Sequence, residues 1–254
     1  MMQSIGCTLF LAEPSKKVLM EKISSLVASN PVLTDLAESA PIMEEIAKNC
    51  CRGSYLNHGS CEWYHGSWQY LRMLDAVSTP DWHGNFYKTN IFKLFSGKGE
   101  IEVLICGLAD YGILSHVLEG CHIAKIEPHI TLFDACQTPL EICSWYLKKH
   151  FPNTRTYSFT GDVTDSNFPL TTYDLIITDA FLTRFDKSDR TKIVDSWKKS
   201  LKPDGSIITT ARIDNHAVRI PIRANPRSVN SFADKAWGKA IERAGLLLPK
   251  KAIK

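Results

Sequence analysis

The sequence has 254 residues, of which 44% are hydrophobic and 22% charged, and its formal net charge is +3. This length is enough for one large α/β domain and a smaller additional lobe. The small net charge gives no electrostatic argument for a nucleic-acid or membrane partner. No apolar stretch approaches the length of a membrane span, and the apolar run 7–12 is too short for a signal sequence.

The cysteine pattern is typical of a reduced protein. Eight cysteines are scattered along the chain without a CxxC pair, and several fall in stretches that are expected to be buried. We therefore expect a cytoplasmic protein. His58, Cys61 and His65 have a spacing that resembles a metal motif, but a second paired unit is missing, although Cys50 and Cys51 lie nearby in the sequence. We therefore expect no metal site.

In chain order, the first 97 residues show helical patterns. Residues 14–29 carry apolar side chains at helical spacing. Pro31 and Pro41 are expected to divide the next stretch of chain into two shorter helical pieces. Residues 61–76, which are rich in aromatic side chains, again have helical spacing. These patterns predict an N-terminal helical lobe over residues 1–97.

The second predicted domain, residues 98–254, shows strands that alternate with helices. Short apolar runs predict strands at 101–106, 130–133, 154–159, 173–178 and 206–213, with a sixth beginning at 246–248. Helices are predicted at 112–119, 139–150, 188–201 and 228–244, the third being closed by a turn at 203–205. This alternation predicts an α/β fold with a doubly wound, mostly parallel sheet. In such sheets a ligand binds at the carboxyl ends of the strands.

Small residues follow the first predicted strand, in the segment Gly107-Leu-Ala-Asp-Tyr-Gly112. Gly107 and Ala109 leave space for the backbone to approach a ligand, and the next helix points its N-terminus toward that ligand. Asp110 and Tyr111 complete the loop. A tight strand-to-helix turn without a ligand gives the same pattern, so both interpretations stay open.

Acidic residues stand at the ends of the next three predicted strands. Asp134 can accept both hydroxyls of a ribose, or it can cap the helix that follows. Because Pro139 suggests that this helix starts later, the ribose interpretation is favoured. Asp162, directly after Gly161, is suited to the edge of an adenine, and Asp179 follows the fourth strand.

The order and spacing of these segments resemble class I S-adenosylmethionine (SAM)-dependent methyltransferases. Residues 103–112 resemble the glycine-rich first motif of the family, residues 173–181 its fourth motif, and residues 201–206 its Leu-(Lys/Arg)-Pro-Gly-Gly turn. The resemblance implies a Rossmann-like core, SAM as cofactor, and methyl transfer by in-line displacement to an oxygen, nitrogen or sulfur of a small molecule. The cofactor contacts expected in this half of the chain are Gly107, Ala109, Asp110, Tyr111, Asp134, Ala135, Gly161, Asp162, Val163, Asp179, Ala180 and Phe181.

The aromatic segment at 61–76 supplies further candidates. Tyr64, Trp68 and Arg72 are four residues apart, so that they share one face of a helix. This face suits a lid over SAM, with Arg72 binding the carboxylate of the cofactor. In the alternative interpretation Trp68 belongs to the core and Arg72 to the solvated surface.

A proton acceptor is expected from one of two side chains. His65 lies within the aromatic helix and, as a neutral imidazole, can take a proton from the attacking nucleophile. Asp179 is the competing choice for this catalytic role. His58 and Arg184 are candidates for substrate binding, since Arg184 can neutralise an acidic substrate.

Other functions stay open. The glycine segment at 107–112 imitates the fingerprint of an NAD(P)-dependent oxidoreductase, but no Tyr-x3-Lys pair follows. A non-catalytic binding protein with the same fold fits the departures from the family motif, where Ile105 replaces an acidic residue. The Asn-Pro-Pro-aromatic motif of many nucleic-acid methyltransferases is missing. We expect a small-molecule acceptor, neither a nucleic-acid nor a membrane partner, and leave pairing into a homodimer open.

Overall fold

The computed structural model describes residues 31–51, 61–165 and 172–211, together with the single helical residues Ser231, Asp234 and Gly238. The helix predicted at 14–29, most of the helix at 228–244 and the strand at 246–248 lie outside these residues. The chain divides into two compact units. The described residues in 31–38 and 70–77, together with Ser231, Asp234 and Gly238, belong to one unit, and those in 39–69 and 78–211 to the other. The domain boundary near Gly97 stays a prediction.

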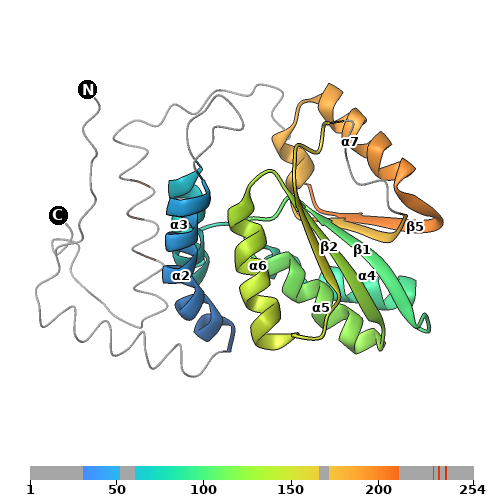
Figure 1. Ribbon diagram of the computed structural model, residues 1–254, viewed down its shortest axis with the longest axis horizontal. Coiled ribbons are helices and arrows are strands. Elements are labelled where there is room, and N and C mark those ends of the chain that lie inside the picture. The colour runs from blue at the N-terminus through green and yellow to red at the C-terminus, as the bar shows by residue number, and fades with distance from the viewer. Residues whose placement is uncertain are drawn as a thin grey trace, which may run out of the picture. The chain divides into compact units, whose positions relative to one another are not determined.

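A five-stranded parallel sheet forms the centre of the larger unit (Figure 1). Its strands are β1 (Glu100–Cys106), β2 (Glu127–Asp134), β3 (Thr156–Thr160), β4 (Tyr173–Thr178) and β5 (Leu201–Thr209). Their order across the sheet is β3-β2-β1-β4-β5, and every neighbouring pair is parallel. The chain therefore moves outward from β1 in one direction and then crosses to its other side. This reversal confirms the doubly wound parallel fold, and it creates the switch point at which ligands bind in such sheets.

Helices cover both faces of this sheet. Figure 1 shows α5 (Gly112–Ala124) and α6 (Gln137–His150) on one side, and α7 (Lys187–Lys199) on the other. Because successive strand side chains point to opposite faces, one set of strand residues packs on α7. This cluster includes Leu104 and Ile176 from the strands, and Trp197 from the helix, all of them fully buried. On the opposite face α5 also contacts α4 (Gly84–Phe95).

The segment around Pro41 differs from the prediction. Helix α2 (Pro31–Cys50) runs without interruption through Pro41. Proline removes one helical hydrogen bond and crowds the preceding turn. Ala40, Met43 and Ala47, which follow helical spacing, are buried, and this burial offsets the loss within a long helix. Downstream lie α3 (Glu62–Met73) and the short 3-10 helix η1 (Pro80–His83). Among the described helices, none is both long enough and apolar enough to cross a bilayer.

Two further boundaries differ from the prediction. Helix α6 begins at Gln137 and not at Pro139, because a proline in the first turn removes only an N–H that has no helical partner. Residues 203–205 lie inside β5 and not in a turn before it. The register shifts there, since Leu201 pairs with Tyr173 while the next pair is Ser206 with Leu175. The intervening residues therefore bulge from the strand.

Asp174 joins three strands of the sheet at one buried carboxylate. Its Oδ2 accepts a hydrogen bond from the Glu102 N–H of β1 at 2.9 Å and one from the Lys202 ammonium of β5 at 2.6 Å. The ammonium of Lys98 lies 3.6 Å from Oδ1. Burial alone would raise the pKa of Asp174, but these partners outweigh it and lower the pKa below its usual value of 3.8.

The substitution Asp174→Asn is expected to lower the free energy of unfolding by roughly 1–3 kcal/mol at neutral pH, because the Glu102 N–H and the partly exposed Lys202 ammonium lose a charged acceptor. A lowered carboxyl pKa stabilises the fold above the unfolded-state pKa, and this stabilisation is lost as the pH falls through the folded-state pKa. The difference between the two proteins should therefore close in acid, as measured by urea denaturation from neutral pH to below pH 3.8.

The matched control is Asp195→Asn. Asp195 lies on α7 with 58% of its side chain exposed, and its oxygen is 3.8 Å from Lys198. An exposed pair of this kind contributes about 0–1 kcal/mol, so the control should unfold almost as the parent does. Equal losses from both substitutions would refute the role given to Asp174.

Candidate functional site

The loop from β1 to α5 turns sharply at Gly107. This residue has a left-handed φ of +70°, and its N–H donates a hydrogen bond to the Phe133 carbonyl of β2 at 3.0 Å. A Cβ at this position would lie 2.0 Å from the ring of Phe181. Only glycine fits, because a side chain would meet both the unfavourable backbone conformation and an aromatic ring.

The remainder of this loop is ordered by its own polar groups. Asp110 is buried, and its Oδ1 accepts the Gly112 N–H at 2.7 Å. The side chain of Tyr111 is also buried; its ring stacks on Tyr146 of α6, with the centroids 4.5 Å apart. Ala109, which precedes Asp110, is half-buried.

Asp134, the last residue of β2, is half-buried and is not the cap of the helix that follows. Its Oδ2 accepts the Leu108 N–H at 2.8 Å, and its Oδ1 accepts the Cys136 N–H at 2.8 Å. The N-cap of α6 is Cys136. The carboxylate thus joins the loop after β1 to the loop after β2. Burial raises its pKa to about 6, although the N–H groups of Cys136, Leu108 and Ala135 and the charge of Arg184 act in the opposite direction.

The end of β3 lies directly beside this carboxylate. Thr160 pairs with Asp134 across the two strands, and the Gly161 N–H donates to the Asp134 carbonyl at 3.0 Å. Asp162 follows, and its Oδ1 accepts the Thr164 N–H at 2.8 Å and the Thr164 hydroxyl at 2.7 Å. The predicted contacts Ala135 and Val163 flank these acids; the first is exposed and the second is buried in the core.

Asp179 follows β4 and is held by two hydroxyl groups. Its Oδ1 accepts hydrogen bonds from Tyr87 of α4 at 2.5 Å and from Thr210, just after β5, at 2.7 Å. Thr210 also accepts the N–H of Ala180, whose φ is +49°. The sequence prediction missed both partners. Thr210 could have been found from its place after a strand at the same edge, whereas the pattern around Tyr87 carries no such signal.

Helix α3 places Tyr64 near two of these acids. Asp110 and Asp134 both raise the pKa of Tyr64 through their charges, after the larger effect of burial, whereas the charge of Arg184 lowers it. The Arg184 guanidinium donates to the Tyr64 hydroxyl at 3.2 Å and lies 5.6 Å from the centre of its ring. The structure therefore brings together four residues that the sequence analysis selected on separate grounds.

The rest of the predicted lid face is less exposed than a solvated surface would be. The rings of Tyr64 and Trp68 lie 5.2 Å apart, and Trp68 is buried. Arg72 is also buried, with 4% of its surface exposed, so the alternative that placed it on the solvated surface is wrong. Arg72 belongs to the smaller compact unit, and its contact with a cofactor stays a prediction.

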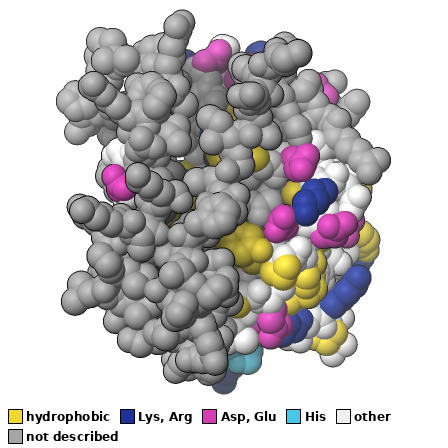
Figure 2. All heavy atoms as spheres, turned by 90° about the vertical axis from the view of Figure 1, so that its left-hand side faces the viewer, with side chains coloured by type: hydrophobic (Ala, Val, Ile, Leu, Met, Phe, Trp, Pro, Cys, Tyr) yellow, Lys and Arg dark blue, Asp and Glu magenta, His cyan; other side chains and the backbone are white. Residues whose placement is uncertain are grey.

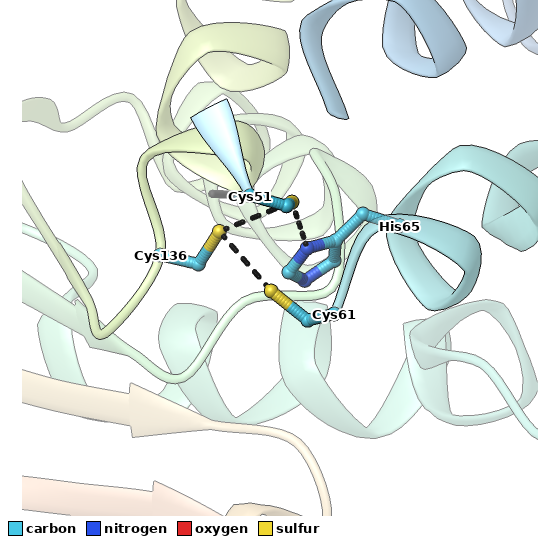
Figure 3. Close-up of side chains that lie close together, drawn as sticks. All are labelled: Cys51, Cys61, His65 and Cys136. Atoms are coloured by element: carbon cyan, nitrogen blue, oxygen red, sulfur yellow. Dashed lines mark hydrogen bonds between the residues drawn. The ribbon is translucent and has the colours of Figure 1, made fainter. Parts of the chain in front are cut away.

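His65 lies in a group of sulfur atoms. Its Nδ1 is 3.3 Å from the Sγ of Cys51, and Cys61 and Cys136 complete a cluster whose side chains point toward one another (Figure 3). Burial and the charge of Arg184 lower the pKa of His65 to about 4, so its imidazole is neutral at neutral pH. Its role as a catalytic base stays a prediction. The other histidine candidate, His58, lies outside the described residues.

Comparison with known proteins finds similarity only among solved structures. No model of a protein family and no curated protein matches the sequence. The glycopeptide N-methyltransferase MtfA, solved with S-adenosylhomocysteine, is 16% identical over 49% of this chain and 51% of its own, with a TM-score of 0.39. The CcbJ methyltransferase from Streptomyces caelestis is 11% identical over 50% of this chain and 48% of its own, also with a TM-score of 0.39.

A longer match is found with a provisionally assigned O-methyltransferase from Nostoc punctiforme. It is 16% identical over 88% of this chain and 66% of its own, with a TM-score of 0.44. The chain thus spans less than two thirds of each of these structures. At such identities and TM-scores the likeness carries no information on what this chain binds or transforms.

The substitution Gly107→Ala is expected to lower the free energy of unfolding by about 2 kcal/mol or more. A left-handed alanine costs roughly 1–2 kcal/mol, and overpacking against the ring of Phe181 adds a similar amount. Gly97→Ala is the control, because Gly97 has a φ of +91° but no atom within 4 Å of an added Cβ. Thermal and urea denaturation measure both.

The contribution of the ring can be isolated in a double-mutant cycle. In a Phe181→Ala background, Gly107→Ala should cost no more than Gly97→Ala does. If its cost is unchanged in that background, the ring does not limit the size of residue 107.

Proposed function

We propose that this protein is a SAM-dependent methyltransferase of the Rossmann-like class I type that acts on a small-molecule nucleophile. The observation that carries the proposal is the half-buried carboxylate of Asp134 at the tip of β2, which accepts the Leu108 N–H on one oxygen and the Cys136 N–H on the other, with a smaller contribution from the Ala135 N–H. An ionised carboxylate has about four acceptor positions. Asp134 therefore keeps acceptor capacity for ribose hydroxyls.

The surroundings of Asp134 fit the other parts of this nucleoside cofactor. Asp162 lies at the tip of the adjacent strand, where its carboxylate is fixed by Thr164 and can accept from the amino group of an adenine. The amino-acid portion of SAM carries one positive and one negative group. The buried carboxylate of Asp110 and the guanidinium of Arg184 supply the opposite charges.

SAM supplies a methyl group that is activated by an adjacent sulfonium. The protein must then align the acceptor and keep water away. Asp179 is our choice for the group that orients the acceptor or takes its proton, because Tyr87 and Thr210 hold its carboxylate at the end of β4. The ring of Phe181, which covers Gly107, can stabilise a nearby cation through its π face.

A small acceptor agrees with the charge distribution. Arg184 is exposed and stacks on Tyr64, so it can bind one anionic group of a substrate. Across the described part of the face shown in Figure 2, acidic, basic and apolar side chains lie interspersed. A nucleic-acid partner would favour a one-sided basic surface. A cytoplasmic location and pairing of two chains belong to the proposal on sequence grounds alone.

The proposal is tested by titration calorimetry of the full chain with SAM and, separately, with NAD⁺. We expect saturable binding of SAM and none of NAD⁺. Asp134→Asn should weaken SAM binding about 10-fold or more, since charge-assisted hydrogen bonds contribute roughly 1.5–3 kcal/mol. Asp165→Asn is the matched control, because Asp165 is exposed and lies just beyond the same strand ends.

Circular dichroism of each variant separates a lost ligand contact from a lost fold. Binding of NAD⁺ in place of SAM would refute the proposal, as would equal SAM affinity in the Asp134 variant and its parent. SAM binding without any methyl acceptor among small-molecule libraries would instead favour the non-catalytic alternative.

The affinity for SAM should depend on pH through Asp134. The ionised carboxylate accepts ribose hydroxyls, so protonation below its pKa of about 6 weakens binding. Affinity should be constant well above this pH and fall below it toward the affinity of the Asp134→Asn protein. The Asp134→Asn protein should show no such fall. A parent protein with a flat profile between pH 5 and 8 would contradict the assignment.

A further inference from the structure

We propose that this chain binds one zinc ion through four side chains: Cys51, Cys61, His65 and Cys136. Figure 3 shows these side chains pointing toward a common centre from separate parts of the chain. Cys51 directly follows α2 and continues its last turn through a hydrogen bond to the Ala47 carbonyl. Cys136 lies in the loop between β2 and α6.

Local helical structure aligns the remaining two side chains. The His65 N–H donates to the Cys61 carbonyl at 3.0 Å, so the two residues lie one turn apart on the same face at the start of α3. Other helices present pairs of metal ligands with the same spacing of four residues. The ligand set thus needs three elements, α2, α3 and the loop after β2, to meet.

The distances match a tetrahedral ion. Zinc bonds of about 2.3 Å to sulfur and about 2.0 Å to nitrogen place neighbouring sulfurs about 3.8 Å apart, and sulfur and nitrogen about 3.5 Å apart. The Sγ of Cys136 lies 3.6 Å from that of Cys51 and 3.7 Å from that of Cys61. The Nδ1 of His65 lies 3.3 Å from the Sγ of Cys51. All four ligand atoms lie within 4.8 Å of one another.

The chemistry of the ligands selects the metal and its role. Soft thiolates with one imidazole favour zinc over magnesium or calcium. A polynuclear iron–sulfur cluster would separate its cysteine sulfurs more widely, because several iron and sulfide ions lie between them. Four protein ligands fill the coordination sphere of zinc and leave no position for water or substrate. The ion is therefore structural and takes no part in methyl transfer.

The surroundings support a charged site. Thr138 is fully buried, and its hydroxyl lies 3.0 Å from the Sγ of Cys51, where it can donate to a thiolate. Zinc with three thiolates and one neutral imidazole carries a net charge of −1. The positive charge of Arg184 acts on His65 and so offsets this charge. Such outer partners fix the orientation of metal ligands.

The ion would join the N-terminal helices to the candidate cofactor site. The N–H of Cys136 donates to the Oδ1 of Asp134, while its sulfur would bind the metal. Tyr64 lies between Cys61 and His65 in the sequence, and its ring packs against that of His65 at 5.1 Å. The proposal of a metal site rests on the distances between the four ligand atoms and does not depend on the identity of the cofactor.

The experiment uses the full chain, purified without added metal or chelator. Elemental mass spectrometry should find about one zinc per chain. After the zinc is removed with a chelator, titration with Co²⁺ should give the intense absorption of a tetrahedral, thiolate-rich site that saturates at one ion. Less than a tenth of one zinc per chain, together with an octahedral Co²⁺ spectrum, would overturn the proposal.

Variants locate the site. Cys61→Ser and Cys136→Ser should weaken zinc binding by more than the roughly 10- to 100-fold that loss of an outer-sphere partner causes. Cys50→Ser is the matched control and should keep full zinc content, because Cys50 is next to Cys51 in the sequence but is not part of the cluster. Equal zinc loss in this control would overturn the assignment.

A further variant covers the case in which serine variants fail to fold. His65→Cys should keep one zinc per chain and strengthen the thiolate-to-Co²⁺ absorption, because a fourth sulfur replaces nitrogen. An unchanged Co²⁺ spectrum in this variant would exclude His65 as a ligand. A disulfide between Cys51 and Cys136, found by mass spectrometry of the untreated parent, would also overturn the proposal.

Discussion

The structure of the candidate site depends on one half-buried carboxylate that joins two loops. Asp134 accepts the N–H of Leu108 from the loop after β1 and the N–H of Cys136 from the loop after β2. Parallel strands lack the tight hairpins that fix neighbouring loops in antiparallel sheets, so these loops need other restraints at the switch point. Without the carboxylate, two buried N–H groups would lose their acceptor, which costs about 1–3 kcal/mol for each group. The same side chain is therefore needed for the fold and for the proposed recognition of a ribose.

Burying this carboxylate carries an electrostatic cost, which explains the arrangement around it. Burial raises the pKa of Asp134 to about 6, and the charge of Arg184 opposes that rise. Arg184 is held in turn by the hydroxyl and ring of Tyr64, from a helix far earlier in the sequence. Through Tyr64, helix α3 thus holds a positive charge that acts on the carboxylate at the end of β2. This arrangement resembles many ligand sites, in which an unfavourable ionisation is maintained by partners on separate elements until a ligand supplies further hydrogen bonds.

The sequence predicted the sheet well because its strands are local apolar runs. For example, β4 has the predicted bounds Tyr173–Thr178. The acidic residues directly after the strands could be selected as site residues because ligands bind at the carboxyl ends of parallel strands. The errors have physical causes. Pro41 was expected to end a helix, but burial along α2 outweighs one lost hydrogen bond. Tyr87 as a partner of Asp179 and Cys136 as a member of the sulfur cluster could not be predicted, since both reach their neighbours only through the tertiary fold.

The cysteine cluster and the carboxylate restrain the same loop in different ways. Cys136 is the N-cap of α6 and has extended backbone geometry without a side-chain cap of its own. Its N–H is bound by Asp134, and its sulfur faces Cys51 and Cys61. Fixing a loop residue costs about 1–2 kcal/mol of conformational entropy, and a bond from the sulfur to the proposed metal would offset that cost. Because its N–H and its sulfur have different partners, Cys136 couples the candidate cofactor site to the sulfur cluster.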